Sequence, residues 1–423
     1  MTCTTEVRQY LSQPRFHKTF ILSPNPETGR LKPHRFSYSD FGDHSSNAVV
    51  LFCGGLMATR LCYSPLDQLA NTHNVRIIHA DRPGIGRSST INLEKRVQLW
   101  LEMVPQLLKR LNIPYVSLAS HSGGSIYLLN TLLAYPHLLH PHQPYVCLFA
   151  PWVSVTDCIH SGLQVLTSQL PASVIGQWAP IAKVYNTNIA PLLGLSSSHV
   201  GSRDPLYPLP ILPTLSPTSS NWKVPAGGLS FPGMYKNKLV LALDNDVVIE
   251  ELRQRITNVT FSESMDGMSA DAQLFLGKVP WCSPSIVWSD IDHFVPLLSK
   301  ILEEEDRMHN HATLRIDAFH AEHDNMVGQK GGQWFDDCWK KHPSYHYSSE
   351  VVRGTDHDYI LDVDPAIGAS EKWLRRVRDA VPRPVANVEG TSLLTNEALS
   401  RRTHSLQRTI GWIKRLSWRI HRH

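Results

Sequence analysis

YVSLASHSGGSIYLL, residues 115–129, is the stretch of the chain that decides the fold. A short apolar run ends at Ala119, and an apolar pattern with helical spacing begins at Ile126. The small and polar residues between them predict a strand, a sharp turn and a helix. Because such a turn pushes a serine out of the sheet, we expect the hydroxyl of Ser122 to be exposed.

The helix that follows this turn begins with backbone N–H groups that have no partner within the helix. Such donors, together with the helix dipole, suit an oxygen that develops negative charge during a reaction. Ser122 is followed by two glycines, and Ser120 stands where the usual G-x-S-x-G pattern has its first glycine. The stretch therefore indicates a catalytic serine, although a plain Gly/Ser loop would satisfy the same residues.

Short buried strands alternate with helices on both sides of this stretch. The strands are expected at 34–41, 47–52, 75–79, 145–150, 314–320 and 344–352, and the helices at 60–71, 92–111, 329–340 and 366–381. This alternation predicts an α/β fold with a mostly parallel sheet and crossover helices. Ligands of such sheets bind at the carboxyl ends of the strands, so the loops that follow the strands should share one rim.

Three of these loops carry motifs that belong together. They are Cys53-Gly54-Gly55 after the second strand, residues 81–88 (DRPGIGRS) after the third, and Ser120-His121-Ser122-Gly123-Gly124. On these motifs the sequence resembles the α/β-hydrolase superfamily, over roughly residues 34–150 and 312–380. The resemblance implies a mostly parallel sheet with helices on both faces, interrupted by an inserted lid that selects the substrate.

The pattern divides the chain into five parts. We expect an irregular N-terminal arm at 1–33, the first part of the core at 34–151, an inserted lid at 152–311, the second part of the core at 312–381 and a basic tail at 382–423. Within the insertion, only residues 245–256 and 293–306 have a helical pattern.

A serine hydroxyl needs a base, and the base needs a carboxylate that orients it. The resemblance implies the chain order serine, acid, histidine. Asp324 follows the strand at 314–320 and His357 follows the next strand, so we assign Ser122 as nucleophile, His357 as general base and Asp324 as the orienting acid. Glu322 and Asp157 remain alternatives for the acid.

The same resemblance implies two backbone donors for an oxyanion hole. They are the N–H of Gly123 and a second N–H after the strand at 47–52, from Gly55 or, as the alternative, Leu56. His320 and His323 do not form an H-E-x-x-H pair, so no metal site is expected. No cofactor is expected either, because Gly84-Ile85-Gly86 lacks the third glycine of a dinucleotide-binding loop.

The function implied is that of a serine hydrolase, a carboxylesterase or lipase-type enzyme that cleaves a small-molecule or lipid ester through an acyl-enzyme. An acyltransferase of the same fold is an alternative, because His357 to Asp362 match the short pattern H-x-x-x-x-D. A catalytically silent ligand-binding member is the second alternative, but it would have no physical need for all three triad residues.

Charge and cysteine usage narrow the partners and the compartment. The net charge of +4 belongs to the tail, since Leu399–His423 hold seven Lys or Arg and no acidic residue, and the body shows no nucleic-acid signature. The seven cysteines without a C-x-x-C pair suit a reducing compartment. With no signal-peptide pattern at the N-terminus, an intracellular, cytoplasmic protein is expected.

Apolar residues of the tail recur at helical spacing between 405 and 422, with arginine and lysine on the other side. This pattern is typical of a helix that lies in a membrane interface, so we expect a possible peripheral membrane contact there. A tail helix packed on the domain, or a disordered basic tail, would fit the same residues.

Overall fold

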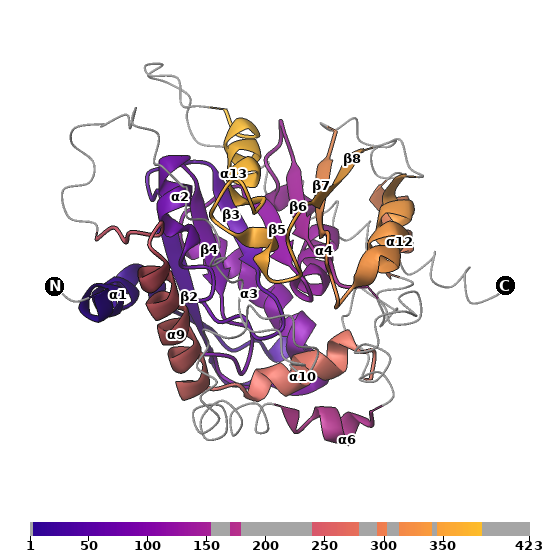
Figure 1. Ribbon diagram of the computed structural model, residues 1–423. Coiled ribbons are helices and arrows are strands. Elements are labelled where there is room, and N and C mark those ends of the chain that lie inside the picture. The colour runs from indigo at the N-terminus through magenta and orange to yellow at the C-terminus, as the bar shows by residue number, and fades with distance from the viewer. Residues whose placement is uncertain are drawn as a thin grey trace, which may run out of the picture.

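The computed structural model describes residues 3–153, 170–178, 239–278, 294–302, 313–340 and 345–382. Its centre is an eight-stranded sheet with the strand order β1-β2-β4-β3-β5-β6-β7-β8 (Figure 1). The strands are β1 Lys18–Leu22, β2 His34–Gly42, β3 Val49–Cys53, β4 Arg76–Ala80, β5 Ser117–His121, β6 Tyr145–Phe149, β7 Arg315–Ala321 and β8 His346–Val352. Only β2 runs antiparallel to its neighbours, so the predicted mostly parallel sheet is confirmed.

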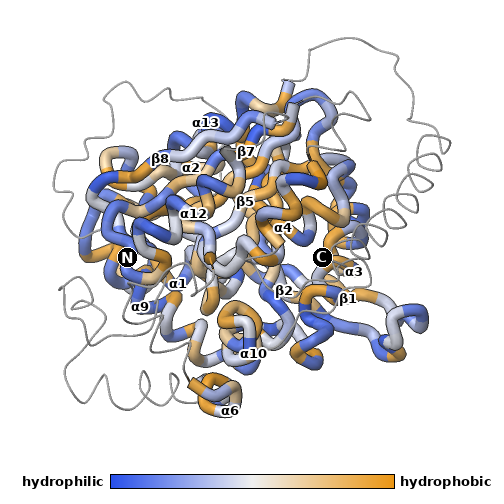
Figure 2. Tube along the Cα trace, turned by 90° about the vertical axis from the view of Figure 1, so that its right-hand side faces the viewer, coloured by the Kyte–Doolittle hydropathy of each residue, from blue (hydrophilic) through white to orange (hydrophobic). Residues whose placement is uncertain are grey.

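Successive side chains of each strand point to opposite faces of the sheet, and both faces are covered. In β3, Val49 and Leu51 belong to one apolar core, whereas Val50 and Phe52 belong to the other. The first core includes residues of α3 Arg96–Arg110, α4 Gly124–Ala134 and α12 Gly328–Lys340; the second includes residues of α2 Leu66–Thr72 and α13 Ser370–Asp379. The predicted helices on both faces are therefore confirmed. Helix α4 is largely hydrophobic along its length (Figure 2).

The N-terminal residues differ from the expected irregular arm. They form α1 Cys3–Leu11, which packs beside α9 Asp246–Ser262, and the edge strand β1 (Figure 1). Val7 and Tyr10 of α1 are fully buried. The sequence pattern missed both elements because each is short. Helix α1 is stabilised by α9, which lies far away along the chain, and β1 by pairing with the next strand, β2.

The described parts of the predicted insertion are helical. They comprise α6 Ala172–Ile175, α9 Asp246–Ser262, α10 Asp266–Phe275 and the helical residues 294–302. Helix α9 and residues 294–302 agree with the helices expected from 245 and from 293, whereas α6 and α10 were not expected. Whether the stretch 152–311 acts as a lid stays a prediction, as do the other domain boundaries. The amphipathic helix expected at 405–422 lies outside the described residues.

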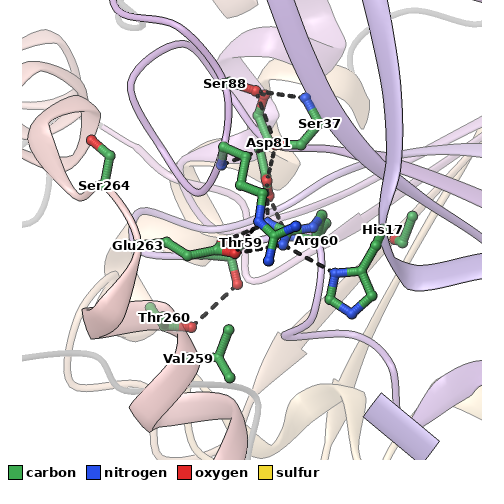
Figure 3. Close-up of polar contacts among 12 residues, drawn as sticks. His17, Ser37, Thr59, Arg60, Asp81, Ser88, Val259, Thr260, Glu263 and Ser264 are labelled. Carbon is green, nitrogen blue, oxygen red and sulfur yellow. Dashed lines mark hydrogen bonds and ion pairs between the residues drawn. The ribbon is translucent and has the colours of Figure 1, made fainter. Parts of the chain in front are cut away.

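The junction between α9 and α10 is fastened to the core by polar contacts (Figure 3). Arg60 donates from both terminal nitrogens to Glu263, at 2.6 and 2.7 Å, and its Nη1 also contacts Asp81 at 2.8 Å. The hydroxyl of Ser264 donates to the carbonyl of Gly84 at 2.9 Å. This part of the insertion is thus held against the loop that follows β4.

Among the described residues, no helix has the length and apolar composition needed to cross a membrane.

Candidate active site

Ser122 occupies the predicted sharp turn between β5 and α4. Its backbone lies in the left-handed region, with φ of 52°, which non-glycine residues adopt rarely. Its N–H donates to the carbonyl of Phe149 at 2.9 Å and so ties the turn to the end of β6. Gly124 is required by space, because a Cβ there would lie 2.1 Å from the carbonyl oxygen of Cys53. The turn is thereby clamped against the ends of two neighbouring strands.

Two further side chains form a hydrogen-bonded line with Ser122. The Ser122 hydroxyl and His357 Nε2 are 2.8 Å apart, and His357 Nδ1 lies 2.8 Å from Asp324 Oδ2. The other carboxylate oxygen of Asp324 accepts from the N–H groups of Met326 and Val327, each at 2.8 Å. The structure therefore brings together all three residues that the sequence selected, and it holds the carboxylate at both oxygens.

The electrostatics of this line favour a carboxylate beside an imidazole that holds its proton firmly. Burial raises the pKa of Asp324, but the adjacent His357 and the two N–H donors outweigh burial and hold the pKa below its ordinary value. Burial lowers the pKa of His357, but the charge and hydrogen bond of Asp324 outweigh it and raise this pKa to about 9. Asp324 is thus placed to stabilise the imidazolium that forms when His357 accepts a proton.

The other acids considered from the sequence lie elsewhere. Glu322 is partly exposed and accepts from the N–H of Gly354 at 2.8 Å, without any contact to His357. Asp362 accepts from the N–H of Asp364 at 2.8 Å, which is a local turn contact. Asp157 lies outside the described residues. Geometry therefore favours Asp324 over Glu322 as the orienting acid.

The expectation that Ser122 is exposed was wrong. Only 6% of its surface is accessible, and 4% of that of His357. Phe275, the last residue of α10, lies over the turn so closely that a Cβ on Gly123 would be 2.0 Å from the ring. Trp152 Nε1 donates to the carbonyl of Phe275 at 2.9 Å and fixes it there. The sequence could not show this cover, because it comes from a helix more than 140 residues away.

The backbone donors expected around Ser122 need one correction. Within the described part of the chain, the N–H of Gly123 donates to no other group, as an oxyanion donor requires. The N–H of Gly55 is already used, since it donates to the hydroxyl of Tyr63 at 3.0 Å. The N–H of Leu56, the alternative, has no acceptor among the described residues. The structure thus favours Leu56 over Gly55 as the second donor.

Tyr63 and His121 connect this loop to the histidine, and the sequence did not single out either of them. His121 Nε2 lies 2.8 Å from the carbonyl of His357, which can only accept, so this nitrogen carries the proton. His121 Nδ1 then accepts from the Tyr63 hydroxyl at 3.1 Å, and that hydroxyl accepts from Gly55. Burial lowers the pKa of His121 to about 3, so the ring is neutral at neutral pH, as this pattern of hydrogen bonds requires.

Other chemistry finds less support around this site. In the described part of the chain, no group of three or more His, Cys, Asp or Glu side chains could hold a metal ion. None of the five described cysteines forms a disulfide; they are Cys3, Cys53, Cys62, Cys147 and Cys338. Burial raises the pKa of Cys53 to about 12, so this thiol beside the turn is a packing residue and not a nucleophile.

Comparison with known proteins gives similarity of fold only. No family model matches the chain, and no curated protein matches it. Solved structures that are similar include one described with the carboxylesterases of Nitrososphaera gargenis, at 14% identity over 80% of this chain and 91% of the other, with a TM-score of 0.45. The enol-lactonase from Burkholderia xenovorans shows 10% identity, coverage of 85% and 99%, and a TM-score of 0.45. The bromoperoxidase from Bacillus anthracis shows 15% identity, coverage of 86% and 98%, and a TM-score of 0.46.

Proposed function

We propose that this chain, whose sheet order and serine turn are those of the α/β-hydrolase fold, is a serine hydrolase that cleaves esters through an acyl-enzyme. The observation that carries the proposal is the line from Ser122 through His357 to Asp324, with 2.8 Å at each contact. A hydroxyl on a strained turn, a base and an orienting carboxylate are the parts that acyl transfer to serine requires.

In the acylation step, Ser122 Oγ attacks the ester carbonyl carbon while its proton moves to His357 Nε2. The carbonyl oxygen becomes an oxyanion that the N–H of Gly123 stabilises from the helix start. As the C–O bond to the alcohol breaks, His357 returns the proton to the leaving oxygen. Asp324 holds the ring in the tautomer that presents Nε2 to the serine.

In the deacylation step, a water molecule takes the place of the alcohol. His357 removes its proton, the water oxygen attacks the acyl carbon, and the proton passes to Ser122 Oγ as the acyl group leaves as a carboxylic acid.

An alcohol or a thiol in place of water would make the same enzyme an acyltransferase. The observation that keeps this second candidate is the spacing of His357 and Asp362.

The experiment is a fluorophosphonate probe and a panel of ester and thioester substrates of varied acyl length, applied to the wild-type protein and to Ser122→Ala. We expect labelling of the wild type at Ser122, and turnover that falls at least about 10⁴-fold in the variant with its thermal denaturation unchanged. An unlabelled wild type, or a Ser122→Ala variant that retains turnover, would refute the proposed function. Acyl products formed with an added alcohol would favour acyl transfer.

A further inference from the structure

The loop that supplies the second oxyanion donor is held by one buried cation. Arg82, which is 2% exposed, donates from Nη1 to the carbonyl of Gly54 at 2.5 Å. Its Nη2 donates to the carbonyls of Gly55 and Leu56, at 2.6 and 2.9 Å. Three successive carbonyl groups therefore face the same guanidinium, which fixes the orientation of three successive peptide planes.

In a planar trans peptide, the N–H and the C=O point in opposite directions. The Gly55 carbonyl and the Leu56 N–H belong to one peptide, so an arginine that binds this carbonyl turns the N–H of Leu56 to the opposite side. Gly55 itself lies against the nucleophile, because a Cβ on Gly55 would be 3.5 Å from the Cβ of Ser122. The N–H of Leu56 belongs to this same loop and is turned away from Arg82, so it is available to an oxyanion that forms at Ser122.

We infer that Arg82 is a positioning residue of the proposed hydrolysis: it holds the loop of residues 54–56 with the N–H of Leu56 turned to the oxyanion, and Asp271 of the inserted helix α10 holds Arg82. The inference rests on the proposed function. It assigns the second oxyanion donor to Leu56 and makes that donor depend on the insertion.

Asp271 ties the arginine to α10. Arg82 Nε donates to Asp271 Oδ2 at 2.6 Å, and Oδ1 accepts from Arg96 Nε at 2.9 Å and from the hydroxyl of Tyr127 at 2.6 Å. Burial raises the pKa of Asp271, but Arg96 and Arg82 outweigh burial and hold this pKa below its ordinary value, so the carboxylate is charged. Asp271 lies on α10 and is fully buried against the core. Arg82 therefore has this anion as a partner only when α10 packs on the core.

The same cluster offers a matched control. Arg96 is as buried as Arg82 and shares the carboxylate of Asp271, but Arg96 Nη1 donates to the carbonyl of Pro83 at 2.6 Å and touches no residue of the 54–56 loop. A purely structural role of the ion cluster would make the two arginines equivalent. A positioning role would make catalysis depend on Arg82 alone.

We would compare Arg82→Lys with Arg96→Lys in fluorophosphonate labelling and in steady-state hydrolysis of an ester and its thionoester. Loss of one oxyanion donor should lower the labelling rate and kcat by about 10²–10³-fold in Arg82→Lys, with KM nearly unchanged. The preference for the ester over the thionoester should also fall, because sulfur accepts hydrogen bonds poorly and gains less from the donor. Arg96→Lys should keep the wild-type rates and preference.

If Arg82→Lys fails to fold, Leu56→Pro and Leu56→Ala decide the question, because only proline removes the N–H. Leu56→Pro should lose about 10²–10³-fold in kcat and Leu56→Ala should not. This inference would be overturned by wild-type rates in Arg82→Lys or in Leu56→Pro, or by equal losses in the two arginine variants. The proposed hydrolase would still stand in those cases, provided that the wild-type protein is labelled by the fluorophosphonate. An unlabelled wild type would overturn the proposed function together with the inference.

Discussion

The two sides of Ser122 are built differently. On one side, Asp324 and His357 come from the loops after β7 and β8, which are neighbours in the sheet and close in sequence. On the other side, the loop after β3 is oriented by Arg82 from the loop after β4, and Arg82 is held by Asp271 of the insertion. The triad side needs only the core, whereas the oxyanion side needs the core and the insertion together.

This difference has a physical consequence. Asp324 and His357 follow the adjacent strands β7 and β8, and Ser122 follows β5 of the same sheet, so all three are positioned by sheet hydrogen bonds that form whenever the core folds. The oxyanion side depends on a buried carboxylate shared by two arginines, and such a cluster is stable only when every charge keeps its partner. Changes to the triad side should therefore alter chemistry alone, while loss of Arg82 or Asp271 should alter both chemistry and stability.

The largest effect is expected on the triad side, from Asp324→Asn. The amide would favour the wrong tautomer of His357, and kcat should fall about 10⁴-fold, as it does for the equivalent change in serine protease triads. Glu322→Gln is the matched control and should retain wild-type kcat, because Glu322 contacts only the N–H of Gly354 and the neighbouring His323. Equal losses in the two variants, measured by ester hydrolysis, would remove Asp324 from its role.

The second effect compares two anchors of the insertion by urea denaturation. Asp271→Asn leaves Arg82 and Arg96 buried without an anion and should lower the free energy of unfolding by about 3–5 kcal/mol. Glu263→Gln should lower it by only about 1–2 kcal/mol, because Arg60 keeps the carboxylate of Asp81. If Glu263→Gln were the more destabilising change, the α9–α10 junction and not Asp271 would be the main anchor.

The third effect is a pH dependence that belongs to the triad side. Burial lowers the pKa of His357, but Asp324, Asp358 and Asp356 raise it above the ordinary 6.5, so His357 is protonated and unable to act as a base at lower pH. We expect kcat/KM to fall about tenfold per pH unit below an apparent pKa that lies above 6.5. In Asp324→Asn, the residual kcat/KM should begin to fall only at a lower pH, since the main charge that raises the pKa of His357 is lost. If kcat/KM fell at the same pH in both proteins, the assignment of Asp324 as the partner of His357 would be contradicted.

The smallest effect is expected from the tail, which was predicted from sequence as a membrane-surface segment. A chain that ends at Pro384 should hydrolyse a soluble ester at the full-length rate, because Ser122, His357, Asp324 and the groups that hold them all lie before that residue. Full-length protein should co-sediment with anionic vesicles more than the shortened one does. Added salt should weaken this binding, because salt screens the attraction between charges that lie farther apart than the Debye length, which is about 8 Å at 0.15 M. Equal sedimentation of the two proteins would reject a membrane role for the tail.

Much of the fold and of the site followed from local pattern. Buried strands such as 47–52 and 145–150 stand out as short apolar runs, because a parallel strand is covered on both faces. Ser122, Asp324 and His357 follow strands of one sheet, and their order along the chain selected them once the family resemblance was recognised, with Glu322 and Asp157 left as alternatives for the acid. The edge strand β1 and helix α1 escaped prediction because both are short, and α1 depends on the distant helix α9.

By itself, the sequence determined which residues can perform the chemistry, since turn, strand and helix signals act over a few residues and place Ser122, Asp324 and His357 at one rim. Only the tertiary structure decided which N–H of the loop after β3 is already used and which is left for an oxyanion. The hydroxyl of Tyr63 takes the N–H of Gly55, and Arg82 turns that of Leu56 away from itself. Both choices depend on the direction of single peptide planes, and partners 8 to 28 residues away along the chain set that direction.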